Sequence, residues 1–173
     1  MSLTQSVLLL AALILTSAFF SIAEIALAAS RRLRLRQMAE DGDARAEQVM
    51  RIQENPGHYF TVVQIGVNAV AVLGGIVGEG VLSPYVSALL ERWLAADTAA
   101  TAGFLVSFLL VTSLFILFAD LIPKRVSMAV PEALAVRVAG PMLFLSALFR
   151  PLVWLYARLT DRLMLLLRLP RAR

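Results

Sequence analysis

The sequence contains no cysteine and a single histidine, His58, among its 173 residues. Without cysteine there is no disulfide framework and no thiolate metal site, and one imidazole leaves little scope for a zinc centre of the usual His/Cys kind. Charged residues make up only 16% of the chain. These scarcities exclude an ordinary soluble domain, whose surface needs more charge.

Apolar residues dominate instead, at 60% of the chain with a mean hydropathy of +0.79. This composition predicts a membrane protein. The formal net charge is +4, but the basic residues cluster beside apolar runs, where they would meet lipid headgroups. We therefore expect the lipid bilayer as a partner and expect no nucleic acid.

Three apolar runs are long enough to cross a bilayer, at about residues 7–29, 60–82 and 99–119. A secretory signal peptide is the alternative for the first run, but residues 1–5 carry no positive charge and the run is long. We predict an all-α membrane protein with three transmembrane helices and cytoplasmic juxtamembrane amphipathic helices. The chain is expected to form a single transmembrane domain over residues 1–173.

The distribution of arginine predicts the orientation in the cell (plasma or inner) membrane. The connection between the first two runs carries six arginines and the next connection only Arg92. Because basic residues favour the cytoplasmic side, the first connection should be cytoplasmic. This places the N-terminus outside and the C-terminus in the cytoplasm.

The juxtamembrane helices are expected at about residues 31–54 and 121–168. Apolar residues recur among charges in the first segment and are interrupted at 41–43, which predicts a helix, a turn and a second helix. A fourth span over residues 141–167 is the alternative in the second segment. It would bury Arg150, Arg158, Asp161 and Arg162, and a charge at a helix centre costs about 2.5–3.5 kcal/mol.

Polar residues within the runs indicate where function lies. Ser17, Ser21 and Glu24 are spaced by four and three, so they share one helix face, and a carboxylate in a membrane helix usually faces a cavity or an ion path. Ser21 and Asn68 each lie eight residues from the cytoplasmic boundary, roughly 12 Å deep, so they could face each other. Helix packing is the alternative for Ser17, and interhelical hydrogen bonding for Asn68.

Such a cluster offers only hydroxyl, amide and carboxylate oxygens, which suit Mg²⁺, Ca²⁺ or Na⁺. Gly66 would let the second helix open and add backbone carbonyls. Glu24 would lie at the entrance of the site. Asp120 closes the third run and is interpreted as an interfacial charge paired with Lys124 at i+4, unless the chain breaks at Pro123.

Several spaced motifs are similar to the transmembrane domain of the CorC/CNNM (cyclin M-like) magnesium transporter family. The segment Phe-Phe-Ser-Ile-Ala-Glu-Ile-Ala-Leu at 19–27 resembles its opening signature. Further matches follow in order at residues 41–43, 66–68, 122–124 and 131–132. The resemblance covers about residues 19–141.

The resemblance implies three spans, a homodimer and export of Mg²⁺ with Na⁺ as the proposed coupling ion. It implies that Ser21, Asn68 and the acid at 120 contribute to the ion site, with Pro123 and Lys124 beside it. The family commonly has glutamate where this chain has Asp120, which puts direct ligation by that residue in doubt. Full-length relatives carry regulatory CBS-type domains that are absent from this sequence, so we expect it to be the membrane domain of a longer chain.

Two other classes of function remain open at this point. The chain could be a membrane scaffold or anchor whose polar residues only hold helices together. An intramembrane enzyme is the weaker alternative, since the sequence has no His-Glu-x-x-His, Gly-x-Ser-x-Gly or paired-aspartate motif. We therefore predict a transporter that works by alternating access, and no enzyme.

Overall fold

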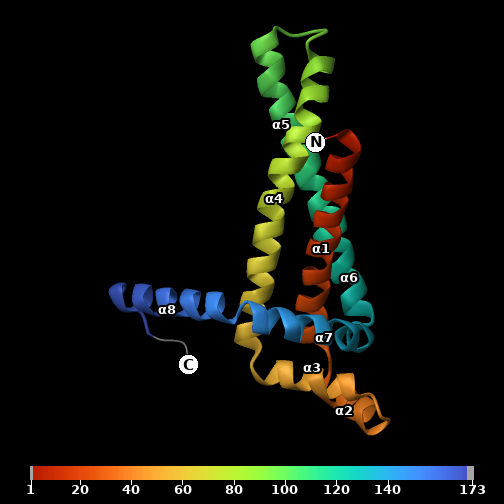
Figure 1. Cartoon of the computed structure of the whole chain (residues 1–173), viewed down its shortest axis with the longest axis vertical. Coiled ribbons are helices and arrows are strands. Elements are labelled where there is room, and N and C mark those ends of the chain that lie inside the picture. The colour runs from red at the N-terminus through yellow and green to blue at the C-terminus, as the bar shows by residue number, and fades with distance from the viewer. Residues whose placement is uncertain (1, 171–173) are drawn as a thin grey trace.

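The computed structural model describes residues 2–170, and every regular element in this range is helical (Figure 1). This confirms the all-α prediction. The elements in chain order are α1 Leu3–Ala29, α2 Arg32–Glu40, α3 Ala44–Glu54, α4 Pro56–Leu90, α5 Ala96–Leu114, the π-helix η1 Phe115–Leu121, α6 Ile122–Ala129, α7 Pro131–Leu148 and α8 Arg150–Leu166.

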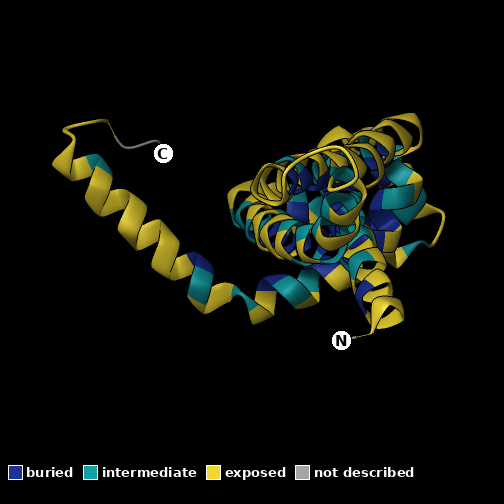
Figure 2. Ribbon diagram, turned by 90° about the horizontal axis from the view of Figure 1, so that it is seen from above, coloured by how far each residue is buried: buried dark blue, intermediate teal, exposed yellow. Residues whose placement is uncertain are grey.

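Three long helical units stand side by side along the axis of the molecule, namely α1, α4 and the continuous run α5–η1–α6 (Figure 1). Helix α4 packs against α5 and α1, and α1 packs against η1 and α6. Helices α7 and α8 run across this axis, and α8 extends away from the bundle in both views (Figures 1 and 2).

Four helical stretches are long and apolar enough to cross a membrane by length and composition: Leu3–Ala29, Pro56–Leu90, Ala96–Ala129 and Pro131–Leu148. The first three contain the three runs identified in the sequence. The fourth is α7, which lies across the end of the bundle in Figure 1. By length and composition the structure therefore has four candidate spans where the sequence predicts three. The count of three spans stays a prediction.

The connection between α1 and α4 is the predicted pair of helices. Helices α2 and α3 are joined at residues 41–43, where Gly42 has φ +100°, a conformation that glycine adopts readily. The carboxylate of Asp43 accepts the backbone N–H of Arg45 and caps α3. The Arg45 guanidinium, which donates to the same carboxylate, lowers the pKa of Asp43.

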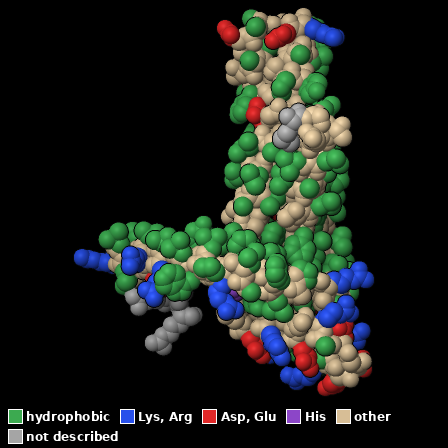
Figure 3. All heavy atoms as spheres, in the orientation of Figure 1, with side chains coloured by type: hydrophobic (Ala, Val, Ile, Leu, Met, Phe, Trp, Pro, Cys, Tyr) green, Lys and Arg blue, Asp and Glu red, His purple; other side chains and the backbone are tan. Residues whose placement is uncertain are grey.

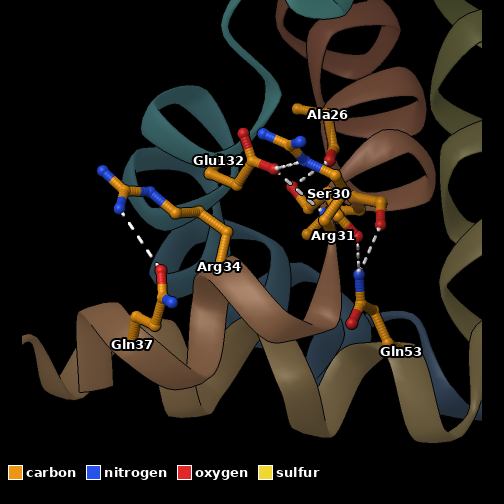
Figure 4. Close-up of polar contacts among 8 residues, drawn as sticks. Ala26, Ser30, Arg31, Arg34, Gln37, Gln53 and Glu132 are labelled. Carbon is orange, nitrogen blue, oxygen red and sulfur yellow. Dashed lines mark hydrogen bonds and ion pairs between the residues drawn. The ribbon is translucent and has the colours of Figure 1, made fainter. Parts of the chain in front are cut away.

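The apolar core lies at the end of the bundle that carries α2 and α3. The buried side chains of this core come mainly from the second half of α1, from α3, from the start of α4 and from α7. Polar contacts join the same elements (Figure 4). Gln53 Nε2 donates to the carbonyls of Leu27 and Ser30 at the end of α1, and Glu132 Oε1 on α7 accepts the backbone N–H and Nε of Arg31.

Glycines of α4 allow close contact with neighbouring helices. A Cβ at Gly66 would overlap the ring of Phe20, and one at Gly74 would overlap the ring of Phe115. Helix α4 nevertheless continues unbroken from Pro56 to Leu90. The expectation that the helix opens at Gly66 is wrong here, because this glycine makes room for an aromatic ring of α1.

The third unit widens before Pro123 instead of breaking. In η1 the Ile122 N–H donates to the Leu117 carbonyl, five residues back. Proline lacks an N–H and its ring crowds the carbonyl four residues earlier, so a wider turn is one way to keep the helix continuous. The helix therefore extends to Ala129, beyond the predicted end at residue 119.

Helix α8 is mostly exposed, and Arg158 stacks over the ring of Trp154 with its Cζ 4.7 Å from the ring centroid. The alternative fourth span over residues 141–167 is wrong, because α7 ends at Leu148 and α8 starts at Arg150 in a new direction (Figure 2). Lysine and arginine side chains gather at the end of the molecule that carries α2 and α3 (Figure 3).

Candidate functional site

A cavity of about 310 Å³ lies between α1, α4 and the η1–α6 segment. Its polar lining consists of Ser17, Ser21, Glu24, Gln64, Asp120 and Lys124. The face of α1 singled out in the sequence, with serines and a carboxylate at steps of four and three, therefore points into one cavity. We call this the carboxylate cavity.

A network of charges from α1, η1 and α6 occupies this cavity. Lys124 Nζ lies 3.0 Å from Asp120 Oδ1 and 3.4 Å from Glu24 Oε2. Ser21 Oγ donates to Asp120 Oδ1 at 3.5 Å. The side chains of Glu24, Lys124 and Asp120 are 22%, 34% and 45% exposed, so they are accessible from within the cavity. A primary ammonium group thus sits between two carboxylates.

Asp120 is deeper in the bundle than the sequence indicates. The expected i+4 pair with Lys124 is present, and α6 continues without a break to Ala129, so Asp120 reaches the level of Ser21 without the kink that the sequence required. Asp120 lies nine residues before that end and Ser21 eight residues before the end of α1. At the helical rise both are roughly 12 Å from the helix ends, which explains their contact.

The structure does not bring Asn68 into the carboxylate cavity. Helix α4 begins at Pro56, four residues before the predicted start of the span, so Asn68 lies about one turn further from that end than expected. It lines a neighbouring hollow together with Gln64 and Tyr156. Gln64 lines both spaces and occupies the level expected of Asn68. The sequence held a signal for Gln64, since it is an amide four residues before Asn68 on the same helix face.

The remaining candidate residues have structural contacts. Gly66 is buried against Phe20, next to Ser21 in the chain. Ser17 is buried and lines the carboxylate cavity one turn from Ser21. Pro123 is buried in α6, and its carbonyl accepts a hydrogen bond of 2.8 Å from Ser127 Oγ.

The donor set is suited to cations in two ways. The two carboxylates already hold an ammonium group, and charge-assisted hydrogen bonds of this kind are strong. The hydroxyl and carboxylate oxygens also suit a hard metal ion. Among residues 2–170, however, no three or more His, Cys, Asp or Glu side chains gather in a way that could hold a metal ion. A metal ion here would depend on two carboxylates, hydroxyls and water.

Comparison with known proteins places the chain in a family. The family model of the cyclin M transmembrane N-terminal domain matches residues 8–173. The chain belongs to this cyclin M family. The match extends the resemblance found in the sequence to nearly the whole chain, and it agrees with the prediction of a membrane protein.

Similar curated proteins are named for export. A polyamine export protein of Salmonella typhimurium is 49% identical over 169 residues, which cover 98% of this chain and 38% of that protein. The polyamine export protein of Haemophilus influenzae is 46% identical over 173 residues, covering 100% of this chain and 40% of that protein. That of Escherichia coli K12 is 47% identical, covering 98% and 38%. The cyclin M domain described here thus spans about two fifths of the length of these relatives, whose names point to a membrane transporter and not to an enzyme.

Proposed function

We propose that this domain forms the membrane path of a polyamine exporter, and that Glu24 and Asp120 bind an ammonium group of the substrate. The observation that carries the proposal is the position of Lys124 Nζ between these two carboxylates. A linear polyamine is a short alkyl chain with primary ammonium ends, so its end group is chemically the same as the lysine head. The names of the relatives support this substrate class.

In the proposed mechanism Lys124 holds the carboxylates when substrate is absent and leaves them when an ammonium group arrives. Exchange of one ammonium for another keeps both acids in contact with a cation, so neither is left unpaired in the membrane. The end of the bundle with α2 and α3 is taken as cytoplasmic because its connections carry most of the arginines. Alternating access would then carry the cation outward through movement of α4 against the η1–α6 segment.

Export of Mg²⁺, with Na⁺ as the coupling ion, is the second candidate. It is favoured by the hydrogen bond between Ser21 and Asp120, which places a hydroxyl and a carboxylate oxygen together beside Glu24. Mg²⁺ often keeps several waters and needs only one or two protein carboxylates. Displacement of Lys124 would be required here too, because its ammonium occupies the same oxygens.

Isothermal titration calorimetry on the detergent-solubilised chain distinguishes the two candidates. We expect a linear diamine to bind the wild type and Mg²⁺ to compete weakly, and we expect Glu24→Gln and Asp120→Asn each to weaken diamine binding. Glu79→Gln is the matched control, since Glu79 also lies on a membrane helix but lines a separate hollow with Phe104 and Phe108. If the wild type binds Mg²⁺ but no diamine, and the same two variants lose Mg²⁺ binding, magnesium export becomes the better account of the site.

Calorimetry also tests whether the domain is only a scaffold or anchor. In that case neither cation would bind, and the variants would alter folding alone. Efflux of labelled diamine from vesicles that contain the full-length protein then tests direction.

We further propose a homodimer. Asn68 is exposed on the face of α4 that turns away from the carboxylate cavity, at a depth where lipid would leave its amide unsatisfied. A second copy covering this face would satisfy it. A cysteine introduced at Leu73, on the same face, should crosslink two copies into a dimer. A cysteine at Leu15, an exposed residue of α1, should not. Regulation by CBS-type domains in a longer chain stays part of the proposal.

A further inference from the structure

A second cavity, of about 320 Å³, opens on the other side of Glu24. It lies between the end of α1, the end of α3 and the start of α4, and it is lined by Glu24, Leu27, Ala28, Gln53, Tyr59 and Phe60. We call it the vestibule. Glu24 is the one lining residue that the vestibule and the carboxylate cavity share.

The vestibule has weakly negative polar groups on otherwise apolar walls. It adjoins the carboxyl end of α1, where the helix dipole favours a cation. The amide of Gln53 donates from Nε2 to the carbonyls of Leu27 and Ser30, so its Oε1 points away from them (Figure 4). Within residues 2–170 no group donates to this Oε1, which leaves an acceptor free beside the vestibule.

The rest of the wall suits an alkyl chain. Tyr59 and Phe60 add two aromatic rings, which attract ammonium groups through their faces and pack against methylenes. A hydrated Mg²⁺ ion would gain little here, since it gives up its waters reluctantly and needs oxygen ligands. The volume falls at the small end of the range of ligand pockets, which suits a thin aliphatic molecule.

We propose that the vestibule is a second subsite, which holds the alkyl chain and trailing ammonium of a polyamine whose leading ammonium is bound by Glu24 and Asp120. This inference rests on the proposed polyamine function and adds to it a reason for chain-length specificity. A monoamine would fill only the first site. A diamine long enough to pass Glu24 would fill both and bind more tightly.

Two adjacent alanines provide a matched test. Ala28 and Ala29 are both exposed at the end of α1, but only Ala28 lines the vestibule. We expect Ala28→Phe to fill the vestibule and weaken binding of a long diamine about tenfold, the scale of one lost cation–aromatic contact with its buried methylenes. Binding of a monoamine of equal carbon number should change little, and Ala29→Phe should resemble the wild type for both ligands.

Tyr59→Leu is a second variant that keeps apolar bulk while removing the aromatic face. It should reduce the preference for the diamine over the monoamine, whereas Phe144→Leu, at an exposed position of α7, should not. All measurements are calorimetric titrations of the detergent-solubilised chain, with helical content checked by circular dichroism.

The outcomes separate this inference from the proposed function. If the wild type binds diamines and loses them in Glu24→Gln, while Ala28→Phe and Tyr59→Leu leave the diamine preference unchanged, the second subsite is overturned and the polyamine site stands. If the wild type binds no diamine, both proposals are overturned.

Discussion

The hydroxyl of Ser21 donates to the carboxylate of Asp120 across 3.5 Å, although the two residues are 99 positions apart in the chain. This contact fixes the third helical unit against the first at the level of the carboxylate cavity. It also leaves Asp120 free to contact a cation through its remaining lone pairs.

Asp120→Asn should weaken diamine binding by about tenfold. A hydrogen bond to a charged group contributes about 1.5–3 kcal/mol, and the lower end applies because Asp120 is half exposed. Asp120→Glu should keep most of the affinity, since it restores the acid common in the family. Calorimetry measures both. Equal losses in the two variants would contradict this prediction, because they would show that the length of the side chain matters as much as its charge.

Lys124→Met should tighten diamine binding. Methionine keeps much of the length of the side chain but removes the ammonium group that competes for Glu24 and Asp120. Arg125→Met serves as the control, because Arg125 is exposed beside Lys124 and no ion pair joins it to another of the described residues. Weaker binding in Lys124→Met would mean that the lysine helps to hold the substrate instead of competing with it.

Gly66→Ala should destabilise the bundle by about 1–3 kcal/mol, the usual cost of overpacking. The new Cβ would overlap the ring of Phe20, which is buried and has little room to move. Thermal unfolding of the detergent-solubilised chain measures the effect. Gly75→Ala is the control, since a Cβ there would meet open space. Adding Phe20→Leu to Gly66→Ala should recover part of the loss, and no recovery would contradict this account.

The first turn of α3 should become less stable in acid. Hydrogen bonds from Arg45 lower the pKa of Asp43, so the folded carboxyl has a lower pKa than the unfolded one. The resulting stabilisation is complete above the ordinary carboxyl pKa and is lost as the pH falls through the folded value. Hydrogen exchange of the α3 amides should report this loss. Asp43→Asn should abolish the pH dependence while keeping a capping oxygen. If the pH dependence of hydrogen exchange is unchanged in Asp43→Asn, the loss of stability in acid does not come from Asp43.

The sequence was sufficient for features that depend on local pattern. Apolar run length predicted the long helices, and the Asp41-Gly42-Asp43 segment predicted the turn between α2 and α3. The shared face of Ser17, Ser21 and Glu24 follows from helical geometry alone, and the structure places all three in one cavity.

The remaining features depend on where helices end and how they are rotated. Helices α4 and α6 end beyond the apolar runs. Counting residues from the end of each run therefore underestimated how far Asn68 and Asp120 lie from the helix ends. Which neighbouring space the amide side chains of α4 face depends on how that helix is rotated about its own axis, and this rotation is set by packing between helices. This is why Gln64 lines the carboxylate cavity while Asn68 lines the hollow beside it.

The π-helical turn of η1 affects the whole of the third unit. Small or buried side chains recur along it at steps of four, at Ala99, Gly103, Ser107 and Val111 and then, beyond Phe115, at Ala119, Pro123 and Ser127. In an α-helix each four-residue step overshoots a full turn by about 40°, so this stripe would wind most of the way around the helix. A π-helical turn rotates the chain by a smaller angle per residue than an α-helical turn, so η1 offsets part of this winding. The helix can therefore change its partner from α4 to α1 along its length while turning its buried side chains toward both.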